Sequence, residues 1–455
     1  MSSLRSREVE IVPGNPFEHC KLDRKKYAEI LTQIIENYSD GFVLSVNNKW
    51  GEGKTTFIKM WKVYLGNNGF KNVYFNAWEH DFGQEPMAAL LSEIKSLELG
   101  NEAKLEGIIK KAGRFTIQAI PILLKAVAEK YVDTETFSDG IKELSQKAID
   151  AFQTEVDEYA KKKEGLEDFK KALEEYVSSL EKPLVFIIDE LDRCNPKYAV
   201  EVLEIIKHFF SVPGIVFVLS IDKEQLGNAV RGYFGSDLIN ADEYLRRFID
   251  LEYSLPNPNI ETFLKSIFAK LNFKEFFGDH RIQESNRFIH FSFWILTRRK
   301  MSLRQIEKLL IQTRISLKTV YHNYALFPDI FFFLNYLKYY DEQFYLKVRD
   351  KEIIVQDLPG KLEDWFLSIN YQRTTLEIGE FELLFIFLYN NSRKDFPRLY
   401  DINTQQFSLN FSPKLSKFTK DTCVNILNGY ETGYINKYDI DYLIGKVELI
   451  ENLEF

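Results

Sequence analysis

The chain has 455 residues, a formal net charge of −8, 45% hydrophobic residues and 28% charged residues. These values are ordinary for a globular protein of two or three domains. The acidic balance argues against a broad electrostatic grip on nucleic acid, although it leaves a local basic patch open.

Cysteines and apolar segments indicate the compartment. The three cysteines, Cys20, Cys194 and Cys423, lie far apart and form no metal-ligand pair, which fits a reducing cytoplasm. The N-terminus has no secretory signal, and no segment reaches the ~20 apolar residues that a membrane span needs. Residues 115–124 come nearest and favour a buried or partner-facing helix over docking on a membrane surface. We therefore expect a cytoplasmic protein without a membrane span.

The first elements are a helix and a strand. Apolar residues from Tyr27 to Ile34 recur at helical spacing, and Asp23 is a suitable N-cap. The apolar run 42–46 predicts a strand. The sequence Gly51-Glu52-Gly53-Lys54-Thr55 comes shortly after it, and a helix is expected over 55–65.

A strand, a glycine-rich turn and a Lys-Thr pair that opens a helix form a phosphate-binding P-loop. Glycines let backbone N–H groups turn toward phosphate oxygens, and the helix N-terminus favours the same anion. Lys54 would reach the β- and γ-phosphates, and the Thr55 hydroxyl would bind Mg²⁺. Asn48 stands where the first glycine is usual; it tolerates positive φ. The alternative is a chance glycine-rich turn before a core helix. The expected nucleotide-binding residues are Trp50, Gly51, Glu52, Gly53, Lys54, Thr55 and Thr56.

A second strand is predicted at 72–75, followed by a helical insertion from about residue 87 to 182. The apolar run 184–188 then predicts a strand buried on both faces. It ends in Asp189 and Glu190. Asp189 is placed to act on Mg²⁺, and Glu190 to polarise the attacking water as a general base. The alternative is an acidic pair that caps a helix.

The following segments alternate between helices and strands. Helices are predicted at 197–210 and 222–234, with strands at 215–221 and 248–253. This alternation predicts an α/β fold with a parallel sheet covered by helices. Ligands bind such sheets beyond the carboxyl ends of the strands, where Ser220 would sense the γ-phosphate.

Pro256 and Pro258 break the chain, and we place the end of the P-loop core, residues 1–256, here. We expect a helical lid over 257–325 and a helical C-terminal domain over 326–455. The apolar run 383–388 fits either a buried helix or a strand.

Five segments together resemble the KAP P-loop NTPases: 49–56, 75–78, 189–196, 244–248 and 302–307. The resemblance covers roughly residues 10–320 and implies an AAA+-like ATPase of the additional-strand class. It implies ATP and Mg²⁺ as cofactors and Glu190 as the catalytic carboxylate. Many members carry two membrane spans in the insertion, whereas this chain resembles a soluble bacterial member.

The resemblance also assigns roles to arginines. Arg247, or its neighbour Arg246, lies where AAA+-like ATPases carry an arginine finger for a neighbouring subunit, which implies a homo-oligomer. The alternative is a surface salt bridge. Arg304 resembles a sensor arginine in the lid, with backbone capping or a nucleic-acid patch as alternatives. For Asp192 and Arg193, a mutual structural pair and a direct catalytic role both stay open. Trp78 is expected in the core.

Three functions follow. The leading hypothesis is an ATPase that drives a conformational or assembly switch, which the resemblance places in antiphage defence with partner proteins of a defence system. The second is an ATP-binding scaffold with little hydrolysis, which docks partner proteins. The third is a nucleic-acid motor, which the acidic charge disfavours.

Overall fold

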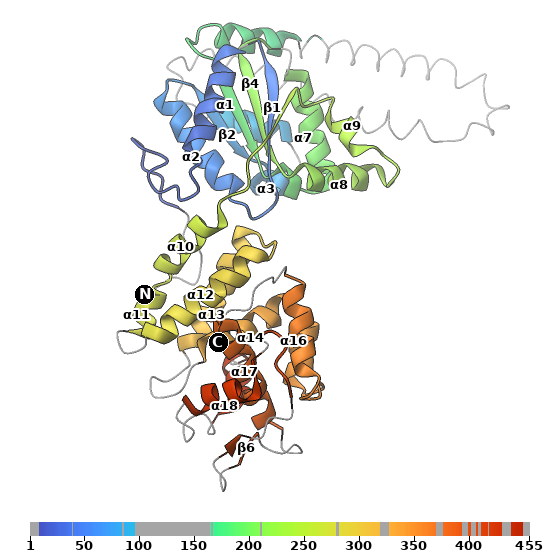
Figure 1. Cartoon of the computed structure of the whole chain (residues 1–455). Coiled ribbons are helices and arrows are strands. Elements are labelled where there is room, and N and C mark those ends of the chain that lie inside the picture. Colours follow the sequence, from blue (N-terminus) through green and yellow to red (C-terminus); the bar gives the residue numbers. More distant parts are fainter. Residues whose placement is uncertain are drawn as a thin grey trace, which may run out of the picture. The chain divides into compact units, whose positions relative to one another are not determined.

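A computed structural model shows two compact units, one within residues 7–257 and one within residues 258–455 (Figure 1). The structure describes residues 9–38, 40–83, 86–95, 164, 167–209, 212–278, 282–318, 327–369, 376–393, 399–401, 406–407, 411–416, 418–429 and 438–448.

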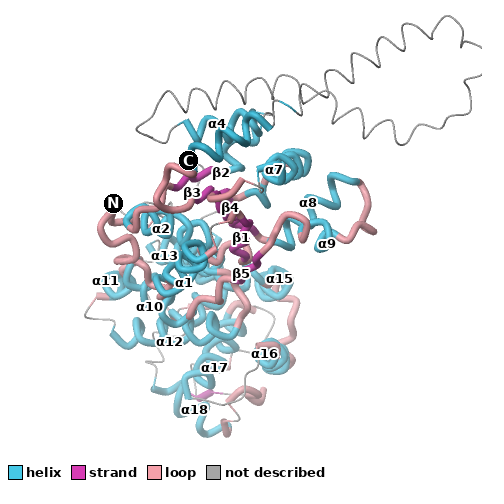
Figure 2. The backbone as a smooth tube through the Cα atoms, turned by 90° about the horizontal axis from the view of Figure 1, so that it is seen from above, coloured by secondary structure: helices cyan, strands magenta, loops and turns pink. Residues whose placement is uncertain are grey.

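The first unit is built on a five-stranded parallel sheet of order β2-β3-β4-β1-β5, which Figure 2 shows side by side. The strands are β1 (Phe42–Asn47), β2 (Asn72–Asn76), β3 (Leu184–Asp189), β4 (Ile215–Ile221) and β5 (Leu251–Ser254). Because β4 lies between β1 and β3, the sheet has the additional strand that the sequence led us to expect. The P-loop α/β fold is confirmed.

Helices cover both faces of this sheet. They are α1 (Lys25–Asn37), α2 (Lys54–Asn67), α3 (Ala77–His80), α4 (Pro86–Lys95), α7 (Pro196–Phe209), α8 (Lys223–Phe234) and α9 (Ala241–Leu245), with 3₁₀ turns η1 (Asp81–Gly83) and η3 (Leu191–Arg193). Residues 167–177 are helical as well.

Alternate strand residues point to opposite faces, so the sheet has two hydrophobic clusters. On β1, Leu44 packs with α1 and α2, whereas Val43 belongs to the cluster that includes α4, α7 and α8. β3 and β4 are buried at every residue, as a strand covered on both faces requires. This rigid centre fixes the strand ends that carry the site.

Two local predictions are wrong. The N-cap of α1 is Arg24, and Asp23 instead has a φ of 51° and accepts a hydrogen bond from the Lys26 amine. The last strand begins at Leu251 because Arg246, Arg247 and Phe248 continue in turns after α9. Phe248 is buried in the core, which explains why this segment has a strand-like apolar pattern.

No helix among the described residues is long and apolar enough to cross a membrane. The apolar segment 115–124, together with most of the expected insertion, lies outside the described residues. The described parts of the insertion, 86–95 and 167–177, are helical.

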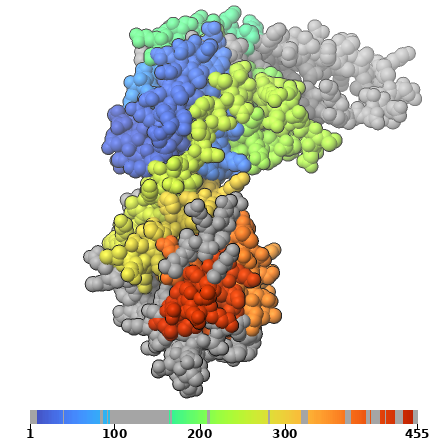
Figure 3. Space-filling view, viewed as in Figure 1, coloured from blue at the N-terminus to red at the C-terminus, as the bar shows by residue number. Residues whose placement is uncertain are grey.

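The second unit is helical. Its helices are α10 (Ile260–Lys270), α11 (Phe273–Phe277), α12 (Ile282–Arg298), α13 (Leu303–Lys318), α14 (Pro328–Tyr340), α15 (Glu342–Arg349), α16 (Leu358–Leu367), α17 (Leu376–Asn391), α18 (Lys420–Gly429) and α20 (Ile440–Glu448). A short antiparallel pair, β6 (Tyr400–Asp401) with β7 (Gln406–Phe407), completes the described elements. In Figure 3 the orange and red residues of the later helices form much of the visible surface of this unit.

One hydrophobic cluster runs through this unit from α10 to α20. α14 is buried along most of its length and contacts α12, α13, α15, α17 and α20. The ambiguous run 383–388 is helical and lies inside α17. The segments expected as a lid and as a C-terminal domain therefore share a single core.

Candidate functional site

The P-loop connects β1 to α2 at the carboxyl edge of the sheet. Gly51 and Gly53 have φ values of 83° and 76°, in the left-handed region that favours glycine. Gly53 is the N-cap of α2, and no side chain caps this helix. The first N–H groups of α2 are therefore free of a side-chain acceptor, as an anion-binding helix N-terminus requires.

Arg24 holds the P-loop through hydrogen bonds to two backbone carbonyl oxygens. Its guanidinium donates to the carbonyl oxygens of Glu52 and Gly53, each at 2.7 Å, and the residue is 2% exposed. Burial lowers the pKa of Arg24, which the charge of Glu52 partly opposes. Because the carbonyls of Glu52 and Gly53 bind Arg24, the loop is held in the left-handed glycine conformation described above.

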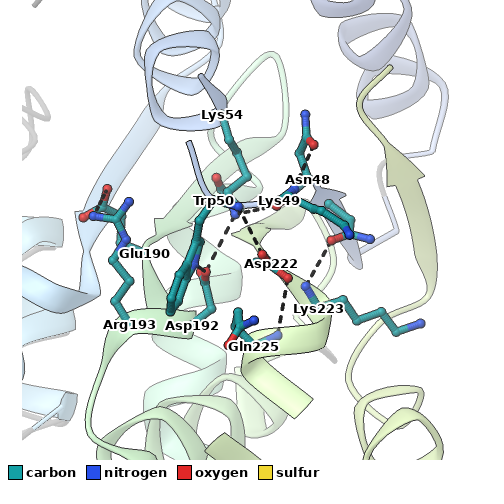
Figure 4. Close-up of polar contacts among 12 residues, drawn as sticks. Asn48, Lys49, Trp50, Lys54, Glu190, Asp192, Arg193, Asp222, Lys223 and Gln225 are labelled. Atoms are coloured by element: carbon teal, nitrogen blue, oxygen red, sulfur yellow. Dashed lines mark hydrogen bonds and ion pairs between the residues drawn. The ribbon is translucent and has the colours of Figure 1, made fainter. Parts of the chain in front are cut away.

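Lys54 is buried between the P-loop and the segment after β3 (Figure 4). Its amine donates to the Asn48 carbonyl at 3.2 Å and lies 3.9 Å from Asp192 Oδ2. The same Asp192 oxygen accepts a hydrogen bond from the Trp50 indole. Asp192 therefore contacts the P-loop rather than pairing with Arg193.

Asn48 does not have a positive φ, so the turn forms without the conformation that asparagine tolerates. Its side-chain oxygen accepts from the Lys49 N–H at 2.8 Å, and its own N–H donates to the Ile221 carbonyl of β4. The Trp50 N–H donates to Asp222 Oδ2 at 3.1 Å. The loop is thus tied to the end of β4 and to the segment that follows it.

Asp189 lies at the end of β3 and is fully buried. Its Oδ1 accepts from the Ser220 hydroxyl at 2.7 Å and from the Glu190 N–H at 2.9 Å, and its Oδ2 accepts from the Tyr74 hydroxyl at 3.0 Å. Burial raises the pKa of Asp189, while the hydrogen bonds from Ser220 and Tyr74 act in the opposite direction. Ser220 therefore contacts the Asp189 carboxylate.

Glu190 links the two motifs. Its Oε1 accepts from the Thr55 hydroxyl at 3.1 Å and lies 3.2 Å from Arg193 Nη1. Glu190 has a φ of 60°, a left-handed conformation that is uncommon outside glycine and clusters at functional sites. The Arg193 guanidinium also lies 5.8 Å from the centre of the Trp78 ring. Trp78 is 54% exposed, so its expected place in the core is wrong.

Lys54 and the polar atoms around it fit a phosphate together with a cation. Burial lowers the pKa of the Lys54 amine, and the nearby Asp192 and Asp189 oppose this shift. Two buried polar atoms, Asn48 Nδ2 and Asp192 Oδ1, have no hydrogen-bond partner among the described residues. These atoms, the uncapped start of α2 and the hydroxyl of Thr55 fit a nucleotide phosphate with a divalent cation.

The side chains of the other predicted residues take no part in these contacts. Arg246 and Arg247 are exposed after α9, and Arg246 pairs with Glu243 at 3.3 Å. Arg304 is exposed near the start of α13 in the second unit. Glu52 and Thr56 are half-buried in the P-loop and the first turn of α2.

Two residues of the site escaped the sequence analysis. Arg24 precedes a helix 28 residues before Glu52 along the chain, and no local pattern connects them. Tyr74 reaches Asp189 only because β2 pairs with β3, with Asn76 beside Asp189. Both contacts join residues that are distant in the sequence, so a short sequence motif does not reveal them.

The fold and this site define a P-loop NTPase. A model of the KAP family P-loop domain matches residues 24–320 of the chain. The chain therefore belongs to the KAP family. No curated protein matches the sequence.

Solved structures share only a distant likeness. A DNA replication initiation factor is 13% identical over 97% of each chain, with a TM-score of 0.31. The Aeropyrum pernix ORC1 protein in complex with DNA is 13% identical, with a TM-score of 0.33 over 86% of this chain and 81% of that one. The Aeropyrum pernix ORC2 protein is 14% identical, with a TM-score of 0.30 over 91% and 95%. At these scores the likenesses carry no inference about function.

Proposed function

We propose that this protein is a Mg²⁺-dependent ATPase that uses hydrolysis to drive a conformational or assembly switch. The observation that carries the proposal is the contact between the motifs: Thr55 of the P-loop helix donates to Glu190, at the end of β3. P-loop enzymes need these two elements together, because one binds phosphate and the other supplies the carboxylates for hydrolysis.

Each residue has a defined task in this proposal. Lys54 binds the β- and γ-phosphates, with backbone N–H groups of residues 51–56 around them. Thr55 and Asp189 would hold Mg²⁺, which when bound would neutralise phosphate charge. Glu190 orients and polarises the attacking water, and Ser220 keeps the Asp189 carboxylate in place.

The finer assignments rest on family membership and on the sequence. They are the preference for ATP over GTP, the antiphage role with partner proteins, the homo-oligomer, an arginine finger at Arg247 and a lid arginine at Arg304. The cysteine spacing supports a cytoplasmic location. Function does not follow from fold, so each of these assignments needs its own test.

A scaffold that binds ATP and scarcely hydrolyses it is the second candidate. The contacts of Glu190 favour it, because Thr55 and Arg193 both engage Oε1 of the proposed general base. These contacts occupy the oxygen that would otherwise be free to accept a proton from the attacking water. Such a protein would bind nucleotide tightly and use its helices to dock partners.

The test compares ATP turnover of the wild-type and Glu190→Gln proteins at several protein concentrations, with and without DNA. The ATPase predicts Mg²⁺-dependent turnover that falls at least ~100-fold in Glu190→Gln, as loss of a general base requires. Equal, near-zero turnover with tight ATP binding in both proteins would support the scaffold instead.

The arginine finger has a matched pair of variants in the same experiment. If Arg247 completes the site of a neighbouring subunit, turnover per subunit rises with protein concentration, and Arg247→Ala removes that rise while Arg246→Ala keeps it. Unchanged turnover in Arg247→Ala would remove this assignment.

A further inference from the structure

Asp192 is a buried carboxylate that the proposed reaction does not use. Its side chain is 1% exposed and lies beside the phosphate-binding lysine. Figure 4 shows Asp192 beside the Trp50 indole and below Lys54, with Arg193 on the other side of the indole. One of its oxygens, Oδ2, serves both Trp50 and Lys54. The other, Oδ1, has no hydrogen-bond partner among the described residues.

The backbone aims this carboxylate at the P-loop. The left-handed turn at Glu190 is followed by the 3₁₀ turn η3, in which the Arg193 N–H donates to the Glu190 carbonyl. Residues three apart lie on the same side of such a turn, so Arg193 meets Glu190. Leu191 is fully buried in the core and fixes the turn from inside. Asp192 is left facing Trp50 and Lys54.

The contact has an electrostatic consequence. Lys54 is the cation that a P-loop offers to phosphate, and here it already has a carboxylate as counter-ion. A bound phosphate would compete with Asp192 for the same amine. It would also place negative charge near a buried carboxylate, where solvent screens repulsion poorly.

We propose that Asp192 is a positioning residue that holds Lys54 and Trp50 and sets the affinity of the P-loop for nucleoside di- and triphosphates. Its negative charge opposes phosphate binding, because the Lys54 amine must give up its contact with the Asp192 carboxylate before it binds the phosphate. Asp192 thus keeps the site from retaining its nucleotide too tightly. The inference rests on the proposed function, because it requires nucleotide at this P-loop.

Asp192→Asn tests this directly, because an amide oxygen still accepts from the Trp50 indole while the charge is removed. We expect ADP and a non-hydrolysable ATP analogue, each with Mg²⁺, to bind about 10-fold more tightly to this variant, in line with one buried like-charge contact. Calorimetry gives both dissociation constants. Asp192→Ser, which removes the charge with a smaller side chain, repeats the test if the amide variant fails to fold.

Asp242→Asn is the matched control. It removes one negative charge from an exposed side chain of α9, where solvent screens it, so nucleotide affinity should stay unchanged. A general loss of negative charge would tighten binding in both variants, whereas the contact with Lys54 predicts an effect of Asp192 alone.

Tryptophan fluorescence supplies a second readout. The Trp50 indole and Lys54 share one oxygen of Asp192, so movement of Lys54 toward a phosphate changes the surroundings of the indole. Nucleotide should therefore change the fluorescence emission of the wild type, and Trp50→Phe should lose that change. If Asp192 only stabilised the fold, Asp192→Asn would weaken nucleotide binding. Tighter nucleotide binding by this variant would therefore exclude a purely structural role of Asp192.

The outcomes separate the two proposals. Unchanged or weaker binding in Asp192→Asn overturns the role of Asp192, whether or not the wild type hydrolyses ATP. Tighter binding without turnover in any variant supports Asp192 and contradicts the ATPase. Folded protein that binds no nucleotide contradicts both.

Discussion

At the scale of single residues, the site combines the side chains of two short motifs with residues that reach them from other strands and turns. Lys54, Thr55, Asp189 and Glu190 stand in short patterns directly after apolar strands, so local sequence places them. The mutual Asp192–Arg193 pair, one of the two alternatives, does not form. Adjacent side chains in a 3₁₀ turn diverge, and each meets a different residue.

Gly53 gives a prediction about the loop itself. Alanine there must adopt a φ of 76°, and its Cβ would lie 3.2 Å from the Arg24 guanidinium. We expect Gly53→Ala to lower the free energy of unfolding by ~1–2 kcal/mol and to weaken nucleotide binding. Denaturant titration and calorimetry measure the two effects.

Gly66 in α2 is the control for Gly53. An added Cβ there meets nothing closer than 3.8 Å. Alanine has the higher helix propensity, so Gly66→Ala should keep or raise stability, by up to ~1 kcal/mol. Equal losses in both variants would mean that the conformation of Gly53 is not special.

At the scale of elements, apolar runs located β1, β3 and β4, because buried parallel strands are continuous apolar segments. The strand β5, whose residues are exposed or half-buried, was predicted from its alternating pattern instead. The start of the last strand was wrong, since Phe248 is buried from a turn. Run 383–388 stayed ambiguous because α17 is apolar all round, which hides the helical period. Strand order follows from tertiary pairing, which the sequence indicated only through the family.

Asp222 caps the helix α8 and also binds the P-loop. Its Oδ1 accepts from the Gln225 N–H at 3.3 Å and caps α8, while its Oδ2 accepts from the Trp50 N–H. Asp222→Ala should lower stability by ~1 kcal/mol, as for a lost N-cap, and should also weaken nucleotide binding because the P-loop loses an anchor.

Asn259→Ala is the matched variant for Asp222→Ala. Asn259 caps α10, a helix of the second unit, through the Thr262 N–H at 3.0 Å. It should cause a similar loss of stability, measured by denaturant titration, with nucleotide affinity unchanged. A loss of affinity in both variants would argue against the anchoring role of Asp222.

At the scale of the whole molecule, the described chain divides into two units with separate hydrophobic cores. The sequence shows Pro256 and Pro258 as a break, because proline interrupts regular elements. It offers no comparable sign of the continuous core that joins α10 to α20. Shared cores arise from contacts distant in sequence, which local patterns do not reveal.

The rates at which the cysteines react with a thiol reagent measure how readily each unit opens. Burial raises the pKa of the Cys423 thiol to about 11 and raises the pKa of Cys194 as well, whereas Cys20 is partly exposed. At pH 8 a thiol reagent should therefore label Cys20 first, since thiolate is the reactive form. Mass spectrometry identifies the labelled residue.

Nucleotide should then protect one buried cysteine only. Ligand at 100 times its dissociation constant stabilises the unit that binds it by ~2.7 kcal/mol. Mg²⁺·ATP should slow labelling of Cys194 in the first unit and leave the rate at Cys423 unchanged. Equal slowing at both residues would mean that the units open together.

The central claim is that the loop between β1 and α2 binds Mg²⁺·nucleotide through Lys54, and direct binding tests it. Since Lys54→Ala alone leaves Asp192 buried without its counter-ion, Lys54→Ala/Asp192→Asn serves as the folded comparison. Titration of Mg²⁺·ATP into the wild type should show one nucleotide per chain, and the double variant should show none. Folded wild type that binds no nucleotide, or equal binding by both proteins, would contradict the account.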